Sequence, residues 1–452
     1  MSEYAKFIRD KSQLGGYYGF DPIFLPDFLF PFQEALLNWS IRKGRAALFA
    51  DCGLGKTPMQ LVWAQNIVEK TNKSVLILAP IAVAAQTVQE GEKFGIQISR
   101  SSGGSPRQDQ GLIVTNYEKL HHFDPSDFIG VVCDESSAIK MFSGARQKAV
   151  TQFMRRMPYR LLCTATAAPN DYIELGTSAE AIGELGRMDM LSRFFKNDED
   201  SMHPIWWGSR WRLKPHGATE FWRWVCSWAR AVRRPSDIGF EDDAFVLPLL
   251  DVKEHVINFS RPLGDKLFAT PAITLDEQRE ERRATIQERC EKAAELIGLN
   301  TAVAWCHLNT EGDLLEKLIP DARQIAGSMS DEEKEELFLA FSSGQLKRLV
   351  TKPKLGGFGL NWQHCHHMTM FPSHSFEQYY QGIRRCWRFG QEFPVSVDIV
   401  TTEGEIGVLK NLQRKSEAAE NMFNILVAEM NNAMGLKHSQ LDHSDIQVPK
   451  WL

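Results

Sequence analysis

Leu48-Phe-Ala-Asp-Cys-Gly-Leu-Gly-Lys-Thr57 is the stretch that decides the fold. An apolar run breaks there into a glycine-bearing loop that ends in Lys56 and Thr57. Its form, A-x-x-x-x-G-K-T, differs from the phosphate-loop pattern G-x-x-x-x-G-K-[ST] only by Ala50 at the first glycine. The run before the loop predicts a buried strand, and Pro58 suits the first turn of a helix over residues 59–69. Strand, loop and helix in this order predict a nucleotide-binding site rather than a chance Gly-Lys-Thr turn.

The residue types of this loop suit a bound triphosphate. Gly53 and Gly55 let the backbone curl so that its N–H groups point at phosphate oxygens, and the positive end of the following helix adds to their effect. We expect Lys56 to reach the β- and γ-phosphates and Thr57 to offer its hydroxyl to Mg²⁺.

Length, charge and cysteine content limit the class of protein. A chain of 452 residues suggests two or three domains of roughly 150 residues each. No apolar run is long enough to cross a bilayer, and the N-terminus lacks the apolar core of a signal peptide, so we expect a cytoplasmic protein without a membrane partner. The net charge of −5 means that any nucleic-acid binding has to use a local basic surface. The eight cysteines form no C-x-x-C pair, and we expect them to be reduced and buried.

Short apolar strands alternate with helical stretches in two parts of the chain. This alternation predicts an α/β fold with two parallel sheets that carry helices on both faces. The expected strands are 46–50, 75–79, 112–115, 129–133 and 160–163 in the first part, and 302–306, 324–326, 348–351, 367–371 and 396–400 in the second. The capping box Ser330-Asp-Glu-Glu333 predicts the start of one helix of the second part.

The alternation lapses between about residues 176 and 250, in a tract rich in Trp and Arg. The predicted domains are an N-terminal lead-in over 1–28, a first lobe over 29–175, a helical insertion and linker over 176–250, a second lobe over 251–404, and a C-terminal helix and tail over 405–452.

A pair of carboxylates follows one of the strands of the first lobe. The strand 129–133 ends in Asp134-Glu135-Ser136-Ser137, and ligands of open α/β sheets bind at the carboxyl ends of strands. We expect Asp134 to hold Mg²⁺ and Glu135 to orient and deprotonate an attacking water. Alone, such a pair is as typical of a helix N-cap, but after a phosphate loop it indicates a triphosphate hydrolase.

Three later motifs complete the set. Thr164-Ala-Thr166 follows the last strand of the first lobe, and Gly356-Gly-Phe-Gly-Leu-Asn361 lies in the second lobe. Gln381-Gly-Ile-Arg-Arg-Cys-Trp-Arg-Phe-Gly-Gln391 matches Q-x-x-G-R-x-x-R-x-G-Q, except that Arg384 replaces the Gly. In this order the motifs resemble those of superfamily 2 helicases and translocases, and most of all the Swi/Snf-like branch in its compact bacteriophage versions. The resemblance implies two RecA-like lobes, the fold of P-loop NTPases, that hydrolyse ATP with Mg²⁺ between them.

The resemblance also assigns roles to individual residues. Gln33 matches the glutamine that reads adenine, and Gly357 and Gly359 match the nucleotide-side glycines of the second lobe. Residues matching positions that contact nucleic acid or couple hydrolysis to movement are Pro80, Gln86, Thr164, Thr166 and Asn361. The family has D-E-A-H or D-E-A-D at residues 134–137, so the two serines argue against a true DEAD-box RNA helicase.

Arg385 and Arg388 are the expected arginine fingers. They lie three residues apart, on one face of an expected helix, so that both guanidinium groups reach across the cleft to the γ-phosphate. The alternative is a solvated basic helix.

The Trp/Arg tract allows two interpretations. Interleaved aromatic and basic residues suit stacking on bases and contacts to phosphates, whereas Phe221, Trp224 and Trp228 lie at helical spacing along one apolar stripe. We expect the tryptophans mainly to pack and arginines such as Arg210 and Arg212 partly to contact nucleic acid.

Together these observations predict an ATP-dependent translocase or helicase that moves along DNA, with duplex favoured. The location implied is the cytoplasm of a bacterium or of a phage-infected host, and partner proteins would supply targeting. An RNA helicase remains an alternative, as does a nucleotide-switched clamp or loader that binds nucleic acid with little turnover.

Overall fold

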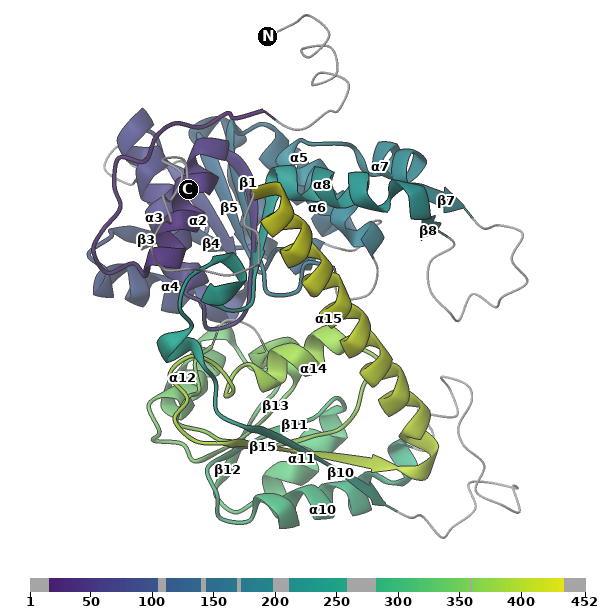
Figure 1. The fold of residues 1–452 in the computed structure, drawn as a ribbon. Helices are drawn as coiled ribbons and strands as arrows, with labels where there is room; N and C mark the ends of the chain where they lie inside the picture. The colour runs from purple at the N-terminus through teal and green to yellow at the C-terminus, as the bar shows by residue number, and fades with distance from the viewer. Residues whose placement is uncertain are drawn as a thin grey trace, which may run out of the picture. The chain divides into compact units, whose positions relative to one another are not determined.

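The chain divides into two compact units. Unit 1 comprises residues 1–242 and 419–452, and unit 2 comprises residues 243–418 (Figure 1). The computed structural model describes residues 16–104, 111–139, 144–168, 172–197, 211–257, 282–357 and 360–434.

Unit 1 is built on a wholly parallel sheet with the strand order β3-β4-β2-β5-β6-β1-β9. Its central strands are continuous apolar runs and are buried along their length, as expected for a parallel sheet covered on both faces. The strands are β1 (Arg45–Ala50), β2 (Val75–Ala79), β3 (Ile98–Arg100), β4 (Leu112–Asn116), β5 (Gly130–Asp134), β6 (Tyr159–Cys163) and β9 (Ala229–Val232).

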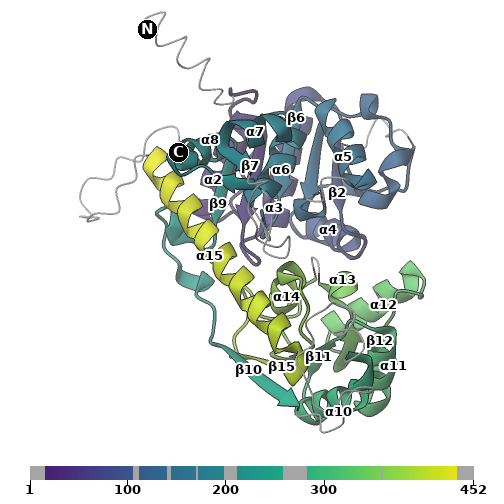
Figure 2. The same ribbon diagram turned by 90° about the vertical axis from the view of Figure 1, so that its right-hand side faces the viewer.

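Helices cover both faces of this sheet (Figure 2). The chain runs outward from β1 to β3 and then returns through β5 and β6 to β9, so right-handed crossovers place the two sets of helices on opposite faces. One set is α2 (Pro31–Lys43), α3 (Lys56–Thr71) and α4 (Ile81–Lys93), and the other is α5 (Ala145–Arg155), α6 (Leu175–Ile182), α7 (Arg187–Phe194) and α8 (Ala218–Trp228).

The tract expected as an insertion and linker over 176–250 differs from that expectation. Its strand β9 pairs in parallel with β1. The aromatic stripe of α8 is buried against the sheet, where the rings of Trp228 and Phe49 meet edge to face with their centres 6.1 Å apart. The expected boundary at 175/176 therefore does not coincide with the division into units. A short antiparallel pair, β7 (Phe195–Asn197) with β8 (Trp211–Leu213), is also part of the tract.

Unit 2 contains a second parallel sheet, with the order β10-β15-β14-β11-β13-β12. The sequence did not predict β10, an edge strand whose charged residues are largely exposed; it pairs with β15 from Leu250 opposite Val395 to Ile257 opposite Thr402. The strands are β10 (Leu250–Ile257), β11 (Ala302–Trp305), β12 (Ala322–Ile325), β13 (Arg348–Thr351), β14 (His367–Met370) and β15 (Val395–Thr402).

The helices of unit 2 also lie on both faces of their sheet. The predicted capping box is confirmed, because Ser330 Oγ accepts from the Glu333 N–H at 3.2 Å and Glu333 Oε2 accepts from the Ser330 N–H at 2.8 Å. The helices are α10 (Ile286–Ile297), α11 (Asn309–Leu318), α12 (Asp331–Ser342), α13 (Pro353–Gly356) and α14 (Phe376–Ile383), followed by α15 (Ile406–Met434), whose residues from Ala419 onward belong to unit 1.

Short 3₁₀ segments complete the described elements. They are η1 (Tyr117–His122), η2 (Pro125–Asp127), η3 (Ser136–Ile139), η4 (Tyr172–Glu174), η6 (Pro215–Gly217), η7 (Pro235–Ile238), η8 (Asp243–Phe245) and η9 (Glu403–Glu405).

The predicted fold class, α/β with two parallel sheets, is confirmed. All eight cysteines are buried and unbonded to one another, also as predicted. Among the described residues, no helix has the length and apolar character needed to span a membrane.

Candidate nucleotide-binding site

The loop between β1 and α3 has the backbone conformation that its glycines predict. Gly53 and Gly55 have φ of 91° and 74°, in the left-handed region that favours glycine. A Cβ on Gly55 would lie 2.2 Å from Nε2 of Gln33, so a larger residue has no room there. The side chain of Gln33 thus closes the loop to a larger residue at position 55.

Gln33 supports this loop from α2. Its Nε2 donates to the Leu54 carbonyl at 2.9 Å, and its Oε1 accepts from the Phe30 N–H at 3.1 Å. The side chain is buried, with 4% exposed. These bonds place the predicted adenine-reading residue directly against the loop.

Lys56 begins α3 and folds back over the loop. Its Nζ donates to the carbonyls of Ala50 at 3.0 Å and Asp51 at 3.2 Å. Both acceptors are neutral carbonyl oxygens, which bind an ammonium group less strongly than an anionic phosphate oxygen does. Lys56 is therefore held at the loop by bonds that a phosphate can replace.

Asp134 is the last residue of β5 and is 5% exposed. Its Oδ1 accepts from Nε2 of Gln60 at 2.6 Å, and its backbone carbonyl accepts from the Tyr117 hydroxyl at 2.6 Å. Burial raises the pKa of the Asp134 carboxyl above its usual range, against the opposing effects of the Gln60 amide and the Lys56 charge. The contribution of Lys56 shows that the two predicted site residues lie within electrostatic range of each other.

Glu135 follows with φ of 49°, a left-handed conformation that is strained for a residue with a side chain. Its side chain is buried, and its Oε2 accepts from Thr164 Oγ1 at 3.4 Å. The same Thr164 oxygen accepts from the Thr166 N–H at 3.1 Å. The two threonines predicted to couple hydrolysis to movement are thus joined to the predicted general base.

Sheet order explains why these residues meet. β5 and β1 both pair with β6, and Cys163 at the end of β6 lies opposite Asp134 on one side and Leu48 on the other. The loop after β1, the carboxylates after β5 and the threonines after β6 consequently share one edge of the sheet.

Polar atoms without hydrogen-bond partners gather at this edge. Among the described residues, buried and unpartnered oxygens include those of Ser136, Ser137, Thr166 and the Gln60 amide. Leaving such an atom unsatisfied costs about 1–3 kcal/mol, so their concentration here fits a site that binds a polar ligand. Carboxylate and hydroxyl oxygens such as those of Asp134 and Thr57 are also the ligand type that Mg²⁺ prefers.

Pro80 and Gln86 belong to the connection after β2. Pro80 is the residue before α4, and Gln86 lies on that helix, where its Nε2 donates to Glu90 Oε1 at 2.8 Å. Their assignment to nucleic-acid contact remains a prediction.

In unit 2, Arg385 and Arg388 do not lie on a helix as expected. α14 ends at Ile383, and both arginines follow it in turns. Arg385 is 1% exposed and donates to the Gln381 carbonyl, to Gln381 Oε1 at 2.9 Å and to the Leu360 carbonyl at 3.1 Å. Arg388 donates to the same Leu360 carbonyl at 3.1 Å. The turn, rather than helical periodicity, brings the two guanidinium groups together.

Two other predicted site residues of unit 2, Gly357 and Asn361, lie close in the sequence to Leu360, whose carbonyl accepts from both arginines. Leu360, the shared acceptor, is followed by Asn361, and Gly357 caps α13. A Cβ on Gly357 would lie 2.2 Å from the Pro353 carbonyl, so only glycine fits. Gly359 lies outside the described residues.

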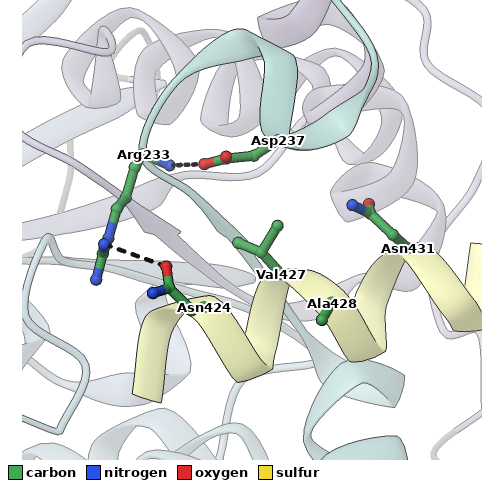
Figure 3. A pocket seen from close by; sticks show the side chains of 6 residues that line it. All are labelled: Arg233, Asp237, Asn424, Val427, Ala428 and Asn431. Carbon is green, nitrogen blue, oxygen red and sulfur yellow. Dashed lines mark hydrogen bonds between the residues drawn. The ribbon is translucent and has the colours of Figure 1, made fainter. Parts of the chain in front are cut away.

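Of the two arginines expected to contact nucleic acid, Arg210 lies outside the described residues and Arg212 is exposed on β8. Another arginine of the tract is held by the chain itself. Arg233 donates to Asn424 Oδ1 at 3.5 Å (Figure 3). It also donates to the Glu420 carbonyl at 3.0 Å and lies 4.6 Å from the Phe423 ring centre. These contacts connect α15 to the residue that directly follows β9.

Beside it is a pocket of about 190 Å³, within unit 1 (Figure 3). This pocket lies on α15 and the β9–η7 segment, and the phosphate loop contributes nothing to its lining, which is formed by Arg233, Asp237, Asn424, Val427, Ala428 and Asn431.

Comparison with known proteins adds to this geometry. Residues 297–390 match the family model of the helicase conserved C-terminal domain. The chain is 22% identical over 449 residues to the "Putative ATP-dependent helicase/translocase YwqA" of Bacillus subtilis (strain 168), covering 83% of this chain and 46% of that protein. The predicted resemblance to ATP-dependent helicases and translocases is confirmed. The chain thus spans about half the length of this helicase relative.

A second relative is of similar length to the chain itself. The "Putative protein p41" of Acyrthosiphon pisum secondary endosymbiont phage 1 is 24% identical over 462 residues, covering 86% of this chain and 96% of p41. Solved structures with similar folds include Mycobacterium smegmatis helicase Lhr bound to ssDNA and AMP-PNP (15% identity, TM-score 0.48, 86% of this chain and 48% of that one). Another is the Sulfolobus solfataricus SWI2/SNF2 ATPase core in complex with dsDNA (16% identity, TM-score 0.41, 89% and 96%).

Sequence reasoning missed Gln60 and Tyr117, the two side chains that hold Asp134. A signal for Gln60 was present, because it is a polar residue four positions after Lys56 in an otherwise apolar part of α3. Tyr117 offered none, since only the sheet brings it to β5.

Proposed function

We propose that this chain is an ATP-dependent DNA translocase, with or without strand separation. The observation that carries the proposal is the shared edge of the unit 1 sheet, where the phosphate loop, Lys56, Asp134 and Glu135 converge. A lysine at a helix start, beside a metal-binding carboxylate and a second carboxylate for water, is the apparatus of triphosphate hydrolysis.

In this proposal, unit 1 binds ATP and prepares the attacking water. Lys56 exchanges its bonds to the Ala50 and Asp51 carbonyls for phosphate oxygens. Thr57 and Asp134 would hold Mg²⁺, which would supply neutralisation of charge on the phosphates. Glu135, kept in place by Thr164, orients the water and accepts its proton.

Unit 2 supplies Arg385 and Arg388 to the γ-phosphate during the catalytic cycle. Arginine fingers of this kind accelerate phosphoryl transfer by roughly 10³–10⁵-fold. Loss of the γ-phosphate removes their ligand, so ATP favours one arrangement of the units over another by its differential affinity. DNA bound to both units would be moved along by that alternation.

DNA is the proposed track because of the similarity to YwqA, whose name describes a helicase or translocase, and the double-stranded form is favoured by the Swi/Snf-like motifs. The similarity to a phage protein supports a bacterial or phage-infected cytoplasm as the location. Partner proteins would direct the motor to its sites.

A comparison of nucleic acids tests the proposal. ATPase activity is measured with double-stranded DNA, single-stranded DNA and RNA of equal length, alongside a strand-displacement assay. We expect the strongest stimulation by duplex DNA. Stimulation by RNA alone would indicate an RNA helicase, and tight nucleotide-dependent binding of nucleic acid without turnover would indicate a clamp or loader.

A further inference from the structure

The Gln60 side chain is an uncommon feature in the buried part of unit 1. It is 1% exposed, yet it is a neutral amide whose neighbours in α3, Met59, Leu61 and Val62, are buried and apolar. A buried amide is retained at a cost unless its polar groups are satisfied. Its presence therefore calls for a function beyond packing.

One half of the amide is fully engaged. Nε2 donates to Asp134 Oδ1 at 2.6 Å, a bond that joins residues 74 positions apart. A bond to a carboxylate is charge-assisted and stronger than one between neutral groups, and this one opposes the burial that raises the pKa of Asp134. Gln60 thus fixes the orientation of the carboxylate.

The other half of the amide is unsatisfied. Gln60 Oε1 is buried and has no hydrogen-bond partner. Because Nε2 is directed at the Asp134 carboxylate, Oε1 is the acceptor of this amide that remains without a partner, as do the hydroxyls of Ser136 and Ser137, which follow Asp134 in the chain. A carbonyl oxygen in that position suits a hydrogen bond from metal-bound water.

We propose that Gln60 is a positioning residue for the magnesium site: its amide N–H holds the Asp134 carboxylate in a fixed orientation, and its carbonyl accepts a hydrogen bond from a water of the bound metal. This inference rests on the proposed function, since it assumes that Asp134 holds the metal of a bound nucleotide. Outer partners of metal ligands typically change metal affinity by about 10–100-fold when they are removed.

The first experiment measures metal-dependent nucleotide binding rather than turnover. A fluorescent ATP analogue is titrated into the full chain at a series of Mg²⁺ concentrations. We expect Gln60→Met, which keeps the length of the side chain and removes both polar groups, to raise the Mg²⁺ concentration for half-maximal binding by about 10-fold. Binding of the metal-free nucleotide should stay near the wild-type value.

A matched control lies on the same helix. Gln65 is partly exposed and donates to Glu69 Oε1 at 3.1 Å, one turn along α3, so Gln65→Met should leave the Mg²⁺ dependence unchanged. A second test places Gln60→Met in an Asp134→Asn background. If Gln60 acts through Asp134, it should add almost nothing there, whereas independent effects would add.

Folding is checked by thermal unfolding of each variant. Should Gln60→Met fail to fold, Gln60→Glu keeps the size of the side chain but replaces the N–H donor with a carboxylate oxygen, so it should show a similarly weakened Mg²⁺ dependence. Wild-type Mg²⁺ dependence in a folded Gln60 variant would overturn the inference alone. Absence of metal-dependent nucleotide binding in the wild-type chain would instead overturn the proposed function.

Discussion

Arg385 and Arg388 donate from their Nη1 atoms to one acceptor, the carbonyl oxygen of Leu360, each at 3.1 Å. Two cations held at one neutral oxygen repel each other, and an anion between them would relieve that repulsion. The pair is therefore suited to a phosphate, although it follows α14 rather than lying on a helix.

If these arginines act on the γ-phosphate, Arg385→Ala should lower the ATPase rate constant by roughly 10³-fold or more. Nucleotide affinity should change much less, because Lys56 and the loop remain. Single-turnover hydrolysis together with equilibrium binding separates the two effects. Arg323→Ala, at an exposed position of β12 in the same unit, is the control. Unchanged hydrolysis by a folded Arg385→Ala protein would exclude the arginine-finger role.

Glu135→Gln should slow hydrolysis by about 10²–10⁴-fold and leave ATP binding intact. The amide keeps the size of the side chain and can still bond Thr164, but it cannot accept the proton of the attacking water. The variant should accumulate ATP-bound protein, measured by retention of labelled nucleotide. The same change at Glu69, on the exposed end of α3, serves as the control, and equal turnover in both variants would contradict the assignment.

Unit 2 owes part of its stability to a fully buried ion pair. Arg289 Nη1 lies 2.8 Å from Glu311 Oε1, both side chains are 0% exposed, and Glu311 Oε2 accepts from the N–H groups of His307 and Leu308. Removing one partner leaves a buried charge, so Glu311→Gln or Arg289→Met should lower the free energy of unfolding by about 3–5 kcal/mol.

Denaturant unfolding measures this loss. Lys292 and Glu295 form an exposed ion pair at 3.1 Å on the same helix, α10, and Lys292→Met should cost less than about 1 kcal/mol. If the variants of the buried and exposed pairs lost similar free energies of unfolding, the buried pair would contribute no more to stability than the exposed one.

His307 should make unit 2 less stable in acid. Burial, helped by the Arg282 charge, lowers the pKa of His307 from 6.5 to about 4, and its Nε2 lies 3.1 Å from the Phe371 carbonyl. Between these values the unfolded chain binds a proton that the folded chain does not, so stability present above pH 6.5 is lost as the pH falls toward 4.

Thermal unfolding from pH 7 to pH 4.5 tests the effect. His307→Gln, which can still donate to the Phe371 carbonyl, should lose less stability over this range than the wild-type chain. His216→Gln, at an exposed position in unit 1, should behave as the wild type does. A His307 variant with the wild-type pH profile would contradict the prediction.

The sequence predicted the buried strands well, because strands covered on both faces need continuous apolar runs. β2 and β13 have the predicted bounds, whereas β9 and β10 were missed. β10 lies at an edge and carries Lys253, Glu254 and His255, so it lacks an apolar run. β9 is recognisable only from its pairing with β1.

The residues of the candidate site likewise divide into those that the sequence predicted and those that it did not. Lys56, Asp134 and Glu135 were predicted from motif spacing, since their chemistry requires fixed residue types close together in the chain. Gln60 was not, because its partner lies 74 residues away and depends on the order of strands. The turn that carries Arg385 was likewise hidden, since a three-residue spacing fits both a helix and a tight turn.

The steady-state ATPase rate of Lys56→Ala, measured with saturating duplex DNA beside wild type and Lys70→Ala, tests the central claim most directly. Lys70 lies exposed on the same helix, so its variant should keep wild-type turnover. If Lys56 binds the phosphates, Lys56→Ala should lose nearly all DNA-stimulated ATP hydrolysis, because no other described residue offers a cation at the start of α3. Undiminished turnover in a folded Lys56→Ala protein would contradict it.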